Sequence, residues 1–205
     1  MPETTRVLVA SRNAKKLREL HRVLAAAGVD GIELVGLDAV PEYPEAPETG
    51  ATFEENALAK ARDGAAATGL PCVADDSGIE VDALNGMPGI LSARWSGTHG
   101  NDPANTALVL AQLADVPEDR RGAAFVSACA LVLPGGEETV VRGEWRGSVA
   151  QEPVGDGGFG YDPVFVPEGD TRSAAELSPE EKDASSHRGR ALVQLVPALA
   201  ALTGR

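Results

Sequence analysis

The sequence has few cysteines and histidines. Its two cysteines, Cys72 and Cys129, are too few and too far apart for a disulfide framework or a cysteine-bound zinc site, so we expect two buried free thiols. The three histidines are scattered without ligand spacing, which argues against a histidine-bound transition metal. Sparse cysteine is typical of a reducing compartment, and we expect a cytoplasmic protein.

Long apolar runs and an excess of positive charge are also lacking. No window approaches the roughly 18 apolar residues of a membrane span, and residues 1–13 lack the pattern of a secretory signal, so we expect no membrane association. Lys and Arg total 18 against 31 Asp and Glu, a net charge of -13 that argues against polymeric nucleic acid as a partner. A small polyanion remains compatible if a few cations converge locally or a divalent cation intervenes.

The sequence contains alternating strand and helix patterns over a length that fits one domain. We expect a single domain over residues 1–205. Helix patterns begin after Thr52, at Asp102-Pro103 and at Ser178, and Glu55 stands at the capping-box position for the first of these. Pro197 is expected to kink or interrupt the last helix. The expected strands are 6–10, 32–37, 70–74 and 164–166, with a hairpin of 123–134 and 137–150, and the first helices are 14–27 and 53–69. This order predicts an α/β protein with a mixed sheet.

The stretch VADDSG, residues 73–78, places two carboxylates at the end of a short apolar run. Asp, Ser and Gly are ordinary turn formers, so a surface turn is one interpretation. The other is a ligand site. Successive strand residues point to opposite faces, so Asp75 and Asp76 cannot both face one site if the strand stays regular. One would hold the turn or a backbone amide, and the other would bind Mg²⁺ or act as a base.

Two further segments have the composition of phosphate-binding elements. SRNAKK, residues 11–16, joins a strand to a helix, so backbone N–H groups and the lysines would face an anion. Asn56 and Lys60 lie four apart on one helix face, with Glu48 just before that helix. Taken singly, each segment is equally compatible with a solvated helix surface.

Two segments in the second half could recognise a base. In GGFGYDP, residues 157–163, glycines permit close approach of a ligand, and Phe159 and Tyr161 offer rings for stacking. In residues 181–189, Lys182, His187 and Arg188 could contact phosphate or a base carbonyl. The alternatives are a buried loop with aromatic plugs and a charged helix surface.

Taken in order, these motifs resemble the inosine triphosphate pyrophosphatase family, which includes the dITP/XTP pyrophosphatases. S-x-N-x-x-K, E-T-G-x-T-F-x-E-N-A-x-x-K-A, A-D-D-S-G, P-G-x-x-S-A-R-[WY]-S-G, G-G-F-G-Y-D-P and S-H-R-G all occur, from Val7 nearly to the C-terminus. The resemblance implies an elongated mixed β-sheet with flanking helices and two lobes around a central nucleotide cleft. It also implies a homodimer that uses Mg²⁺ to hydrolyse ITP, dITP and XTP to the monophosphate and pyrophosphate.

The resemblance also implies roles for individual residues. Asp76, Lys16 and Lys60 would be catalytic, and Asp76 would hold the metal with Glu48, although Glu42 or Glu45 of the same loop could serve instead. Arg12 stands where many relatives have glycine, which leaves the shape of the phosphate turn open. The implied substrate-binding residues are Ser11, Arg12, Asn13, Ala14, Lys15, Lys16, Ser77, Phe159, Gly160, Tyr161, Asp162, Lys182, His187 and Arg188.

These implications lead to a prediction for the two adjacent aspartates and to one for base selection. We predict that Asp76 faces the cleft, holds Mg²⁺ and orients water, whereas Asp75 faces the other way or supports the turn and the metal shell. Hypoxanthine and xanthine present a 6-oxo acceptor, so a donor such as Arg188 or a backbone amide near Asp162 would accept them and reject adenine.

Several alternatives stay open at this point. A pyrophosphatase for pyrimidine or modified nucleotides and a nucleotide-binding sensor without hydrolysis would share many of these motifs. The sequence does not fix the preference between ITP and XTP, the way in which GTP is excluded, or whether Trp95 is core or interface.

Overall fold

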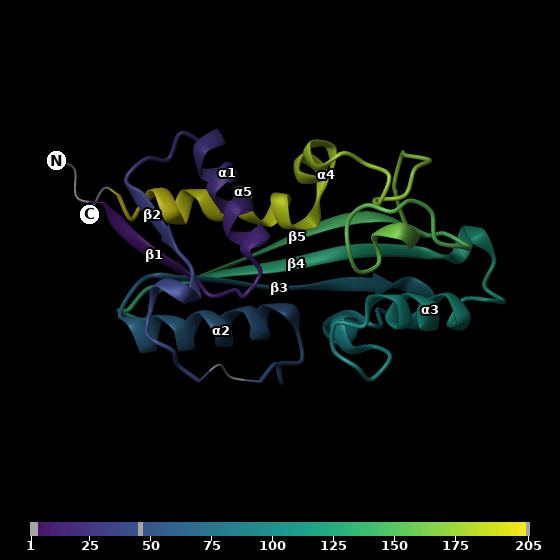
Figure 1. Cartoon of the computed structure of the whole chain (residues 1–205), viewed down its shortest axis with the longest axis horizontal. Helices are drawn as coiled ribbons and strands as arrows, with labels where there is room; N and C mark the ends of the chain where they lie inside the picture. Colours follow the sequence, from purple (N-terminus) through teal and green to yellow (C-terminus); the bar gives the residue numbers. More distant parts are fainter. Residues whose placement is uncertain (1–3, 45–46, 204–205) are drawn as a thin grey trace. The chain divides into compact units, whose positions relative to one another are not determined.

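The computed structural model describes residues 4–44 and 47–203, so the predicted alternative metal ligand Glu45 lies outside the described residues. Figure 1 shows the helices and strands in chain order. The strands are β1 (Thr5–Val9), β2 (Ile32–Val35), β3 (Cys72–Val81), β4 (Gly122–Val132), β5 (Glu138–Val149) and β6 (Phe165–Pro167). The α-helices are α1 (Ala14–Ala26), α2 (Phe53–Thr68), α3 (Asp102–Gln112), α4 (Pro179–Ser185) and α5 (His187–Ala200). Short 3₁₀ helices include η3 (Gly89–Arg94), η4 (Glu118–Arg120) and η5 (Asp162–Val164).

The strands form one six-stranded sheet in the order β2-β1-β3-β4-β5-β6. β1 pairs in parallel with β2 and with β3, whereas β5 and β6 are antiparallel. The parallel part matches the strand–helix alternation of the first half of the chain. The predicted α/β class with a mixed sheet is therefore confirmed.

The chain divides into two compact units, each built from separate stretches of sequence. The first unit comprises Met1–Asp76, Ser127–Gly143 and Arg188–Arg205, and the second comprises Ser77–Val126 and Glu144–His187. The expectation of a single domain stays a prediction.

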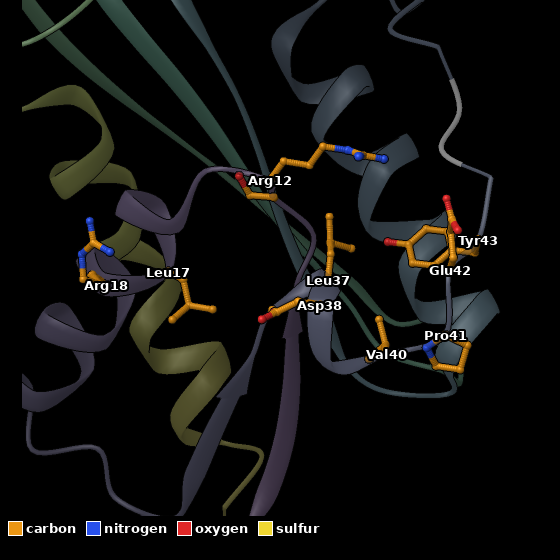
Figure 2. Close-up of a pocket in the computed structure, with 11 residues that line it drawn as sticks. Arg12, Leu17, Arg18, Leu37, Asp38, Val40, Pro41, Glu42 and Tyr43 are labelled. Carbon is orange, nitrogen blue, oxygen red and sulfur yellow. The ribbon is translucent and has the colours of Figure 1, made fainter.

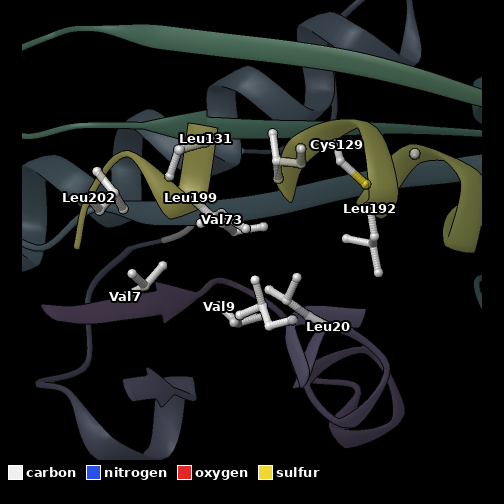
Figure 3. Close-up of a cluster of buried hydrophobic side chains, with 12 residues drawn as sticks. Val7, Val9, Leu20, Val73, Cys129, Leu131, Leu192, Leu199 and Leu202 are labelled. Carbon is white, nitrogen blue, oxygen red and sulfur yellow. The ribbon is translucent and has the colours of Figure 1, made fainter. Parts of the chain in front are cut away.

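In the first unit, α1 and α5 pack on one face of the strands. Leu20 and Leu24 of α1 and Leu195 and Leu199 of α5 are at most 5% exposed, and Figure 3 shows several of these side chains with those of the strands. α2 covers the opposite face, where a Cβ added at Gly64 would lie 2.5 Å from the Sγ of Cys72. Residues 7–9 of β1 are all buried, as expected for a strand segment that is covered on both faces.

In the second unit, Val109 of α3 and the C-cap residue Leu113 pack into a core that is rich in aromatic rings. The ring of Phe125 lies 4.5 Å from that of Phe165, measured between centroids. Trp95, left open between core and interface, packs against this core, and its indole Nε1 donates to Gln112 at 2.9 Å.

The local signals for helix starts are confirmed. The Thr52 hydroxyl accepts from the Glu55 amide at 3.1 Å, and Ser178 and Glu181 form a reciprocal capping box. α2 ends as predicted at Gly69, which adopts φ 68°, a conformation that favours glycine.

Two expectations from the sequence were wrong. The strand predicted to end at residue 74 continues to Val81, so VADDSG is buried strand and not a surface turn. Pro197 does not interrupt the last helix, since α5 continues through it to Ala200, whereas the alternative expectation of a kink at Pro197 stays a prediction. The interruption lies instead at Ser186, whose ψ of 154° separates α4 from α5.

Both cysteines are free and buried, as predicted, and burial raises the pKa of each thiol to about 12. Among the described residues, no helix has both the length and the apolar character needed to cross a bilayer.

Candidate functional site

Asp75 and Asp76 occupy neighbouring positions in β3, and their side chains have different partners. Because residue orientation alternates along a strand, the two carboxylates diverge. Asp75 contacts the Nζ of Lys16 at 2.7 Å and the Nε of Arg188 at 3.2 Å. Asp76 accepts from Asn56 at 2.9 Å and lies 3.2 Å from the Nζ of Lys60. The predicted divergence of the pair is thus observed within the first unit.

Asp75 is the centre of a buried ion-pair network. Its side chain is 9% exposed, and Arg188 also contacts Glu19 of α1 at 3.4 Å. Burial alone would raise the pKa of Asp75, but the charges of Lys16 and Arg188 outweigh it and hold the pKa well below its ordinary value. At neutral pH Asp75 is therefore an anion, and it holds the ammonium group of Lys16 at 2.7 Å.

Asp76 has a different electrostatic environment. Burial raises its pKa above the ordinary value, with a smaller contribution in the same direction from Glu48, while Lys60 and Asn56 oppose the shift. Lys60 lies 2.5 Å from Glu48, and its own pKa is raised by Asp76 and Glu48 against the effect of burial. The three side chains form a carboxylate–ammonium–carboxylate cluster.

The donor chemistry of this cluster suits Mg²⁺. Glu48 and Asp76 both reach the ammonium group of Lys60, so two carboxylates converge on one cationic position. Mg²⁺ is typically held by one or two carboxylates together with substrate phosphates and water. No group of three or more histidine, cysteine, aspartate or glutamate side chains within residues 4–44 and 47–203 is placed to hold a metal by itself.

The first turn has the geometry of a helix start. The Asn13 side chain caps α1 by accepting from the Lys15 amide at 2.9 Å, and the Ser11 hydroxyl accepts from the Asn13 amide at 3.1 Å. The side-chain oxygens of Ser11 and Asn13 thus support the turn itself. Lys15 is exposed, and the side chain of Ala14 is outside the description.

Ser11 and Arg12 also line a cavity of about 700 Å³ in the first unit. Figure 2 shows Leu17, Leu37 and Val40 around it. Glu42 lines this cavity, whereas Glu48 contacts Lys60. Of the two described candidates for the second metal carboxylate, the geometry therefore favours Glu48.

The second unit contains the glycine loop and α4. Asp162 is 2% exposed, accepts from the Phe159 amide at 2.7 Å and pairs with Lys182. The Nζ of Lys182 lies 4.8 Å from the centroid of the Phe159 ring, which is 48% exposed. The Tyr161 hydroxyl donates to the carbonyl of Ser92 at 2.8 Å. The structure thus brings together the predicted residues Phe159, Asp162 and Lys182.

Three other predicted site residues have surroundings that the sequence did not indicate. His187 is 6% exposed and stacks on Phe125 at 5.0 Å between ring centroids. Arg188 is buried against Asp75 and Glu19. Ser77 is half-buried in β3. Their roles toward a substrate stay predictions.

Sequence reasoning missed Glu19 and Asp102. Glu19 lies three residues after Lys16, a helical spacing that could have placed it on the same face of α1. Asp102 was taken only as the opening of a helix, but its carboxylate accepts from the Gly160 amide at 2.8 Å. No local pattern connects two residues so far apart in the sequence.

Comparison with known proteins agrees with these motifs. The model of the Ham1 family matches residues 7–198. A dITP/XTP pyrophosphatase of Nocardia farcinica is 76% identical over 200 residues, 98% of this chain and 97% of that protein. The crystal structure of a nucleoside-triphosphatase / dITP/XTP pyrophosphatase from Mycobacterium abscessus is 70% identical, with a TM-score of 0.81 over 95% of this chain and 100% of that one. The structure of a HAM1 protein from Coxiella burnetii is 40% identical, with a TM-score of 0.87 over 97% and 100%. The resemblance to the inosine triphosphate pyrophosphatase family is confirmed, and the chain belongs to the Ham1 family.

Proposed function

We infer that this chain is a nucleoside triphosphate pyrophosphatase, and we propose that it hydrolyses the deaminated purine nucleotides ITP, dITP and XTP to the monophosphate and pyrophosphate. Relatives at 76% and 70% identity are named dITP/XTP pyrophosphatases, which supports the substrate class. The observation that carries the proposal is the convergence of Glu48 and Asp76 on the ammonium group of Lys60, beside the Asp75–Lys16 pair.

Cleavage between the α- and β-phosphates requires stabilisation of negative charge on the departing pyrophosphate. We propose that Lys16 and Lys60 supply it. Asp75 holds the ammonium group of Lys16 at 2.7 Å, so that cation is in place before substrate binds. A preorganised charge of this kind avoids reorganisation during the reaction.

Asp76 is the proposed base that orients and deprotonates the attacking water. Burial and the nearby Glu48 raise its pKa, which brings the carboxylate closer to the range in which a general base is effective. Asn56 and Lys60 fix its two oxygens at 2.9 and 3.2 Å. Bound Mg²⁺, held by Asp76 and Glu48, would neutralise charge on the phosphate oxygens.

Base selection needs a hydrogen-bond donor for the 6-oxo group. The amides of Phe159, Gly160 and Asp162 already donate to Asp162, Asp102 and Phe159 respectively. We propose Lys182 as the donor, because its ammonium group lies beside the exposed Phe159 ring. In adenine the 6-amino group is itself a hydrogen-bond donor and would face the ammonium donor of Lys182 without an acceptor between them. A site built for a 6-oxo acceptor can therefore discriminate against adenine nucleotides by roughly 10⁴.

The test is pyrophosphate release from ITP, XTP, GTP, ATP and dTTP, with and without Mg²⁺. We expect release from ITP and XTP with Mg²⁺, and very little from ATP or dTTP. Preferential hydrolysis of dTTP would indicate a pyrimidine enzyme, and binding of ITP without release at any metal concentration would indicate a sensor. Either result would overturn the proposal.

We also propose, from the resemblance alone, that the protein is a homodimer. Sedimentation equilibrium should then give twice the chain mass of 21.1 kDa.

A further inference from the structure

One residue of the glycine loop, Gly160, is held by α3 through both its backbone amide and its backbone carbonyl. The Gly160 amide donates to the Oδ2 of Asp102 at 2.8 Å, and the Gly160 carbonyl accepts from the Thr106 hydroxyl at 3.3 Å. Asp102 and Thr106 are four residues apart, so they lie one turn apart on the same face of α3. The two contacts are therefore complementary, one for the donor and one for the acceptor of the same residue.

The Asp102 carboxylate is not needed to cap its own helix. Asn101 is the N-cap of α3, and its side chain accepts from the Ala104 amide at 3.3 Å. The contact of Asp102 is directed outside the helix, 58 residues along the chain. The contact of Asp102 with Gly160 is therefore distinct from the general preference for acidic residues in the first turn of a helix.

α3 is a firm support for such contacts. Val109 and Leu113 are fully buried in the core of the second unit. The Asn105 side chain accepts from the Ser96 amide at 2.7 Å and donates to the Ala93 carbonyl at 3.2 Å. Buried and fully paired side chains of this kind fix the helix, and with it the positions of Asp102 and Thr106.

The loop itself needs outside support, because its backbone is unusual. Gly158 and Gly160 adopt φ of 75° and 61°, conformations that side chains rarely allow. Two carboxylates hold consecutive amides, Asp162 that of Phe159 and Asp102 that of Gly160. The Phe159 ring stays 48% exposed between these fixed points.

We propose that Asp102 and Thr106 are positioning residues that fix the glycine loop, and thereby the Phe159 ring, in the conformation that recognises the purine base. This inference rests on the proposed function, since it assigns base recognition to residues 159–162. Neither residue touches the substrate in this proposal. Their loss should therefore affect substrate affinity and base selectivity more than the rate of the bound complex.

The test uses Asp102→Asn and Thr106→Val, with Thr106→Ser as the conservative variant and the exposed Asp119→Asn of η4 as a matched control. We expect Asp102→Asn to raise KM for ITP and XTP about 10-fold, the usual scale for one hydrogen bond to a charged group, with kcat changed less than threefold. Thr106→Val should raise KM by a smaller factor, and Thr106→Ser should restore it. A wild-type KM in Asp102→Asn, or equal losses of kcat in all variants, would overturn the proposal.

A second measurement tests the hydrogen bond between Asp102 and the Gly160 amide independently of enzyme activity. Hydrogen exchange of the Gly160 amide, followed by NMR, should be about 10-fold faster in Asp102→Asn than in Asp119→Asn. Unchanged exchange would overturn the positioning role even if the enzyme hydrolyses ITP. Absence of hydrolysis in the wild-type protein, with Gly160 exchange accelerated as expected, would instead count against the proposed function.

Discussion

Asp75 and Asp76 differ by one position in β3, and their conversion to asparagine should have opposite consequences. Asp75→Asn removes a buried anion that holds Lys16 at 2.7 Å and Arg188 at 3.2 Å. Asp76→Asn removes a carboxylate whose ionised form is disfavoured by burial. We expect the first variant to lose stability and the second to lose activity without losing stability.

The magnitude for Asp75 follows from what the substitution leaves behind. Lys16 is 21% exposed and can regain water, but Arg188 stays buried beside Glu19. Removing one partner of a buried ion pair costs about 3–5 kcal/mol, and the partial exposure of Lys16 argues for the lower end, about 3 kcal/mol. For a chain of this length that corresponds to a fall in Tm of roughly 6–12 °C.

The pH dependence of stability has a definite sign for each residue. The folded-state pKa of Asp75 is depressed, so its stabilising contribution is present above the unfolded pKa of about 3.9 and is lost as pH falls through the folded value. The folded-state pKa of Asp76 is raised, so the ionised group opposes folding once pH rises above that value. Asp76→Asn should therefore be as stable as wild type, or more stable, at pH 7.

The assays are thermal unfolding by circular dichroism and pyrophosphate release from ITP with Mg²⁺. The exposed Asp30→Asn serves as a control for loss of one surface charge. Asp76→Asn should lower kcat by about 10² or more, the usual cost of removing one acid–base element. If Asp75→Asn abolished turnover at unchanged Tm while Asp76→Asn remained active, the assignment of the two residues would be reversed.

Three further substitutions test separate parts of the structure. Glu48→Gln should raise the Mg²⁺ concentration needed for half-maximal activity by roughly 10-fold or more, as measured by Mg²⁺ titration. The reason is that loss of even a residue that only supports a metal ligand lowers metal affinity by about that factor. Gly64→Ala places a Cβ 2.5 Å from the Sγ of Cys72. The resulting overpacking costs about 1–3 kcal/mol and should outweigh the gain in helix propensity of about 1 kcal/mol. The variant should therefore be less stable, with a lower urea midpoint of unfolding. Arg121→Met leaves two buried carbonyls and one partly buried carbonyl without the guanidinium that donates to them at 2.8–2.9 Å. It should lower Tm by several degrees with KM for ITP unchanged. An unaltered Mg²⁺ titration for Glu48→Gln, an unaltered urea midpoint for Gly64→Ala or an unaltered Tm for Arg121→Met would contradict the corresponding expectation.

Local patterns predicted the parts of the fold that depend on local hydrogen bonds. Thr52 and Ser178 mark helix starts because their side chains satisfy amides three residues away, a relation visible in the sequence. The shared helix face of Asn56 and Lys60 was likewise visible, and both side chains reach Asp76.

The errors occurred where distant residues override local preference. Asp-Asp-Ser-Gly has the composition of a turn, yet β3 continues through it. The two carboxylates can stay in a buried strand because Lys16 and Arg188 neutralise one and Lys60 neutralises the other. None of these cations lies within ten positions of the aspartates, so no local pattern could reveal the compensation. The same holds for Asp102 and the Gly160 amide.

The charge balance of the first unit explains how an acidic chain with net charge -13 is compatible with a triphosphate. Among the ion pairs described above for residues 4–44 and 47–203, three cations around β3, Lys16, Lys60 and Arg188, contact four carboxylates, Glu19, Glu48, Asp75 and Asp76. With every group ionised this cluster carries a net charge of -1, three positive against four negative charges, and would repel a polyanion. A divalent cation held by Glu48 and Asp76 would change the balance to +1, and protonation of Asp76 would weaken its binding. We therefore expect affinity for a non-hydrolysable ITP analogue, measured by calorimetry, to fall about tenfold or more without Mg²⁺ and to fall further as the pH is lowered and Asp76 becomes protonated. Equal affinity with and without the metal would contradict this charge argument.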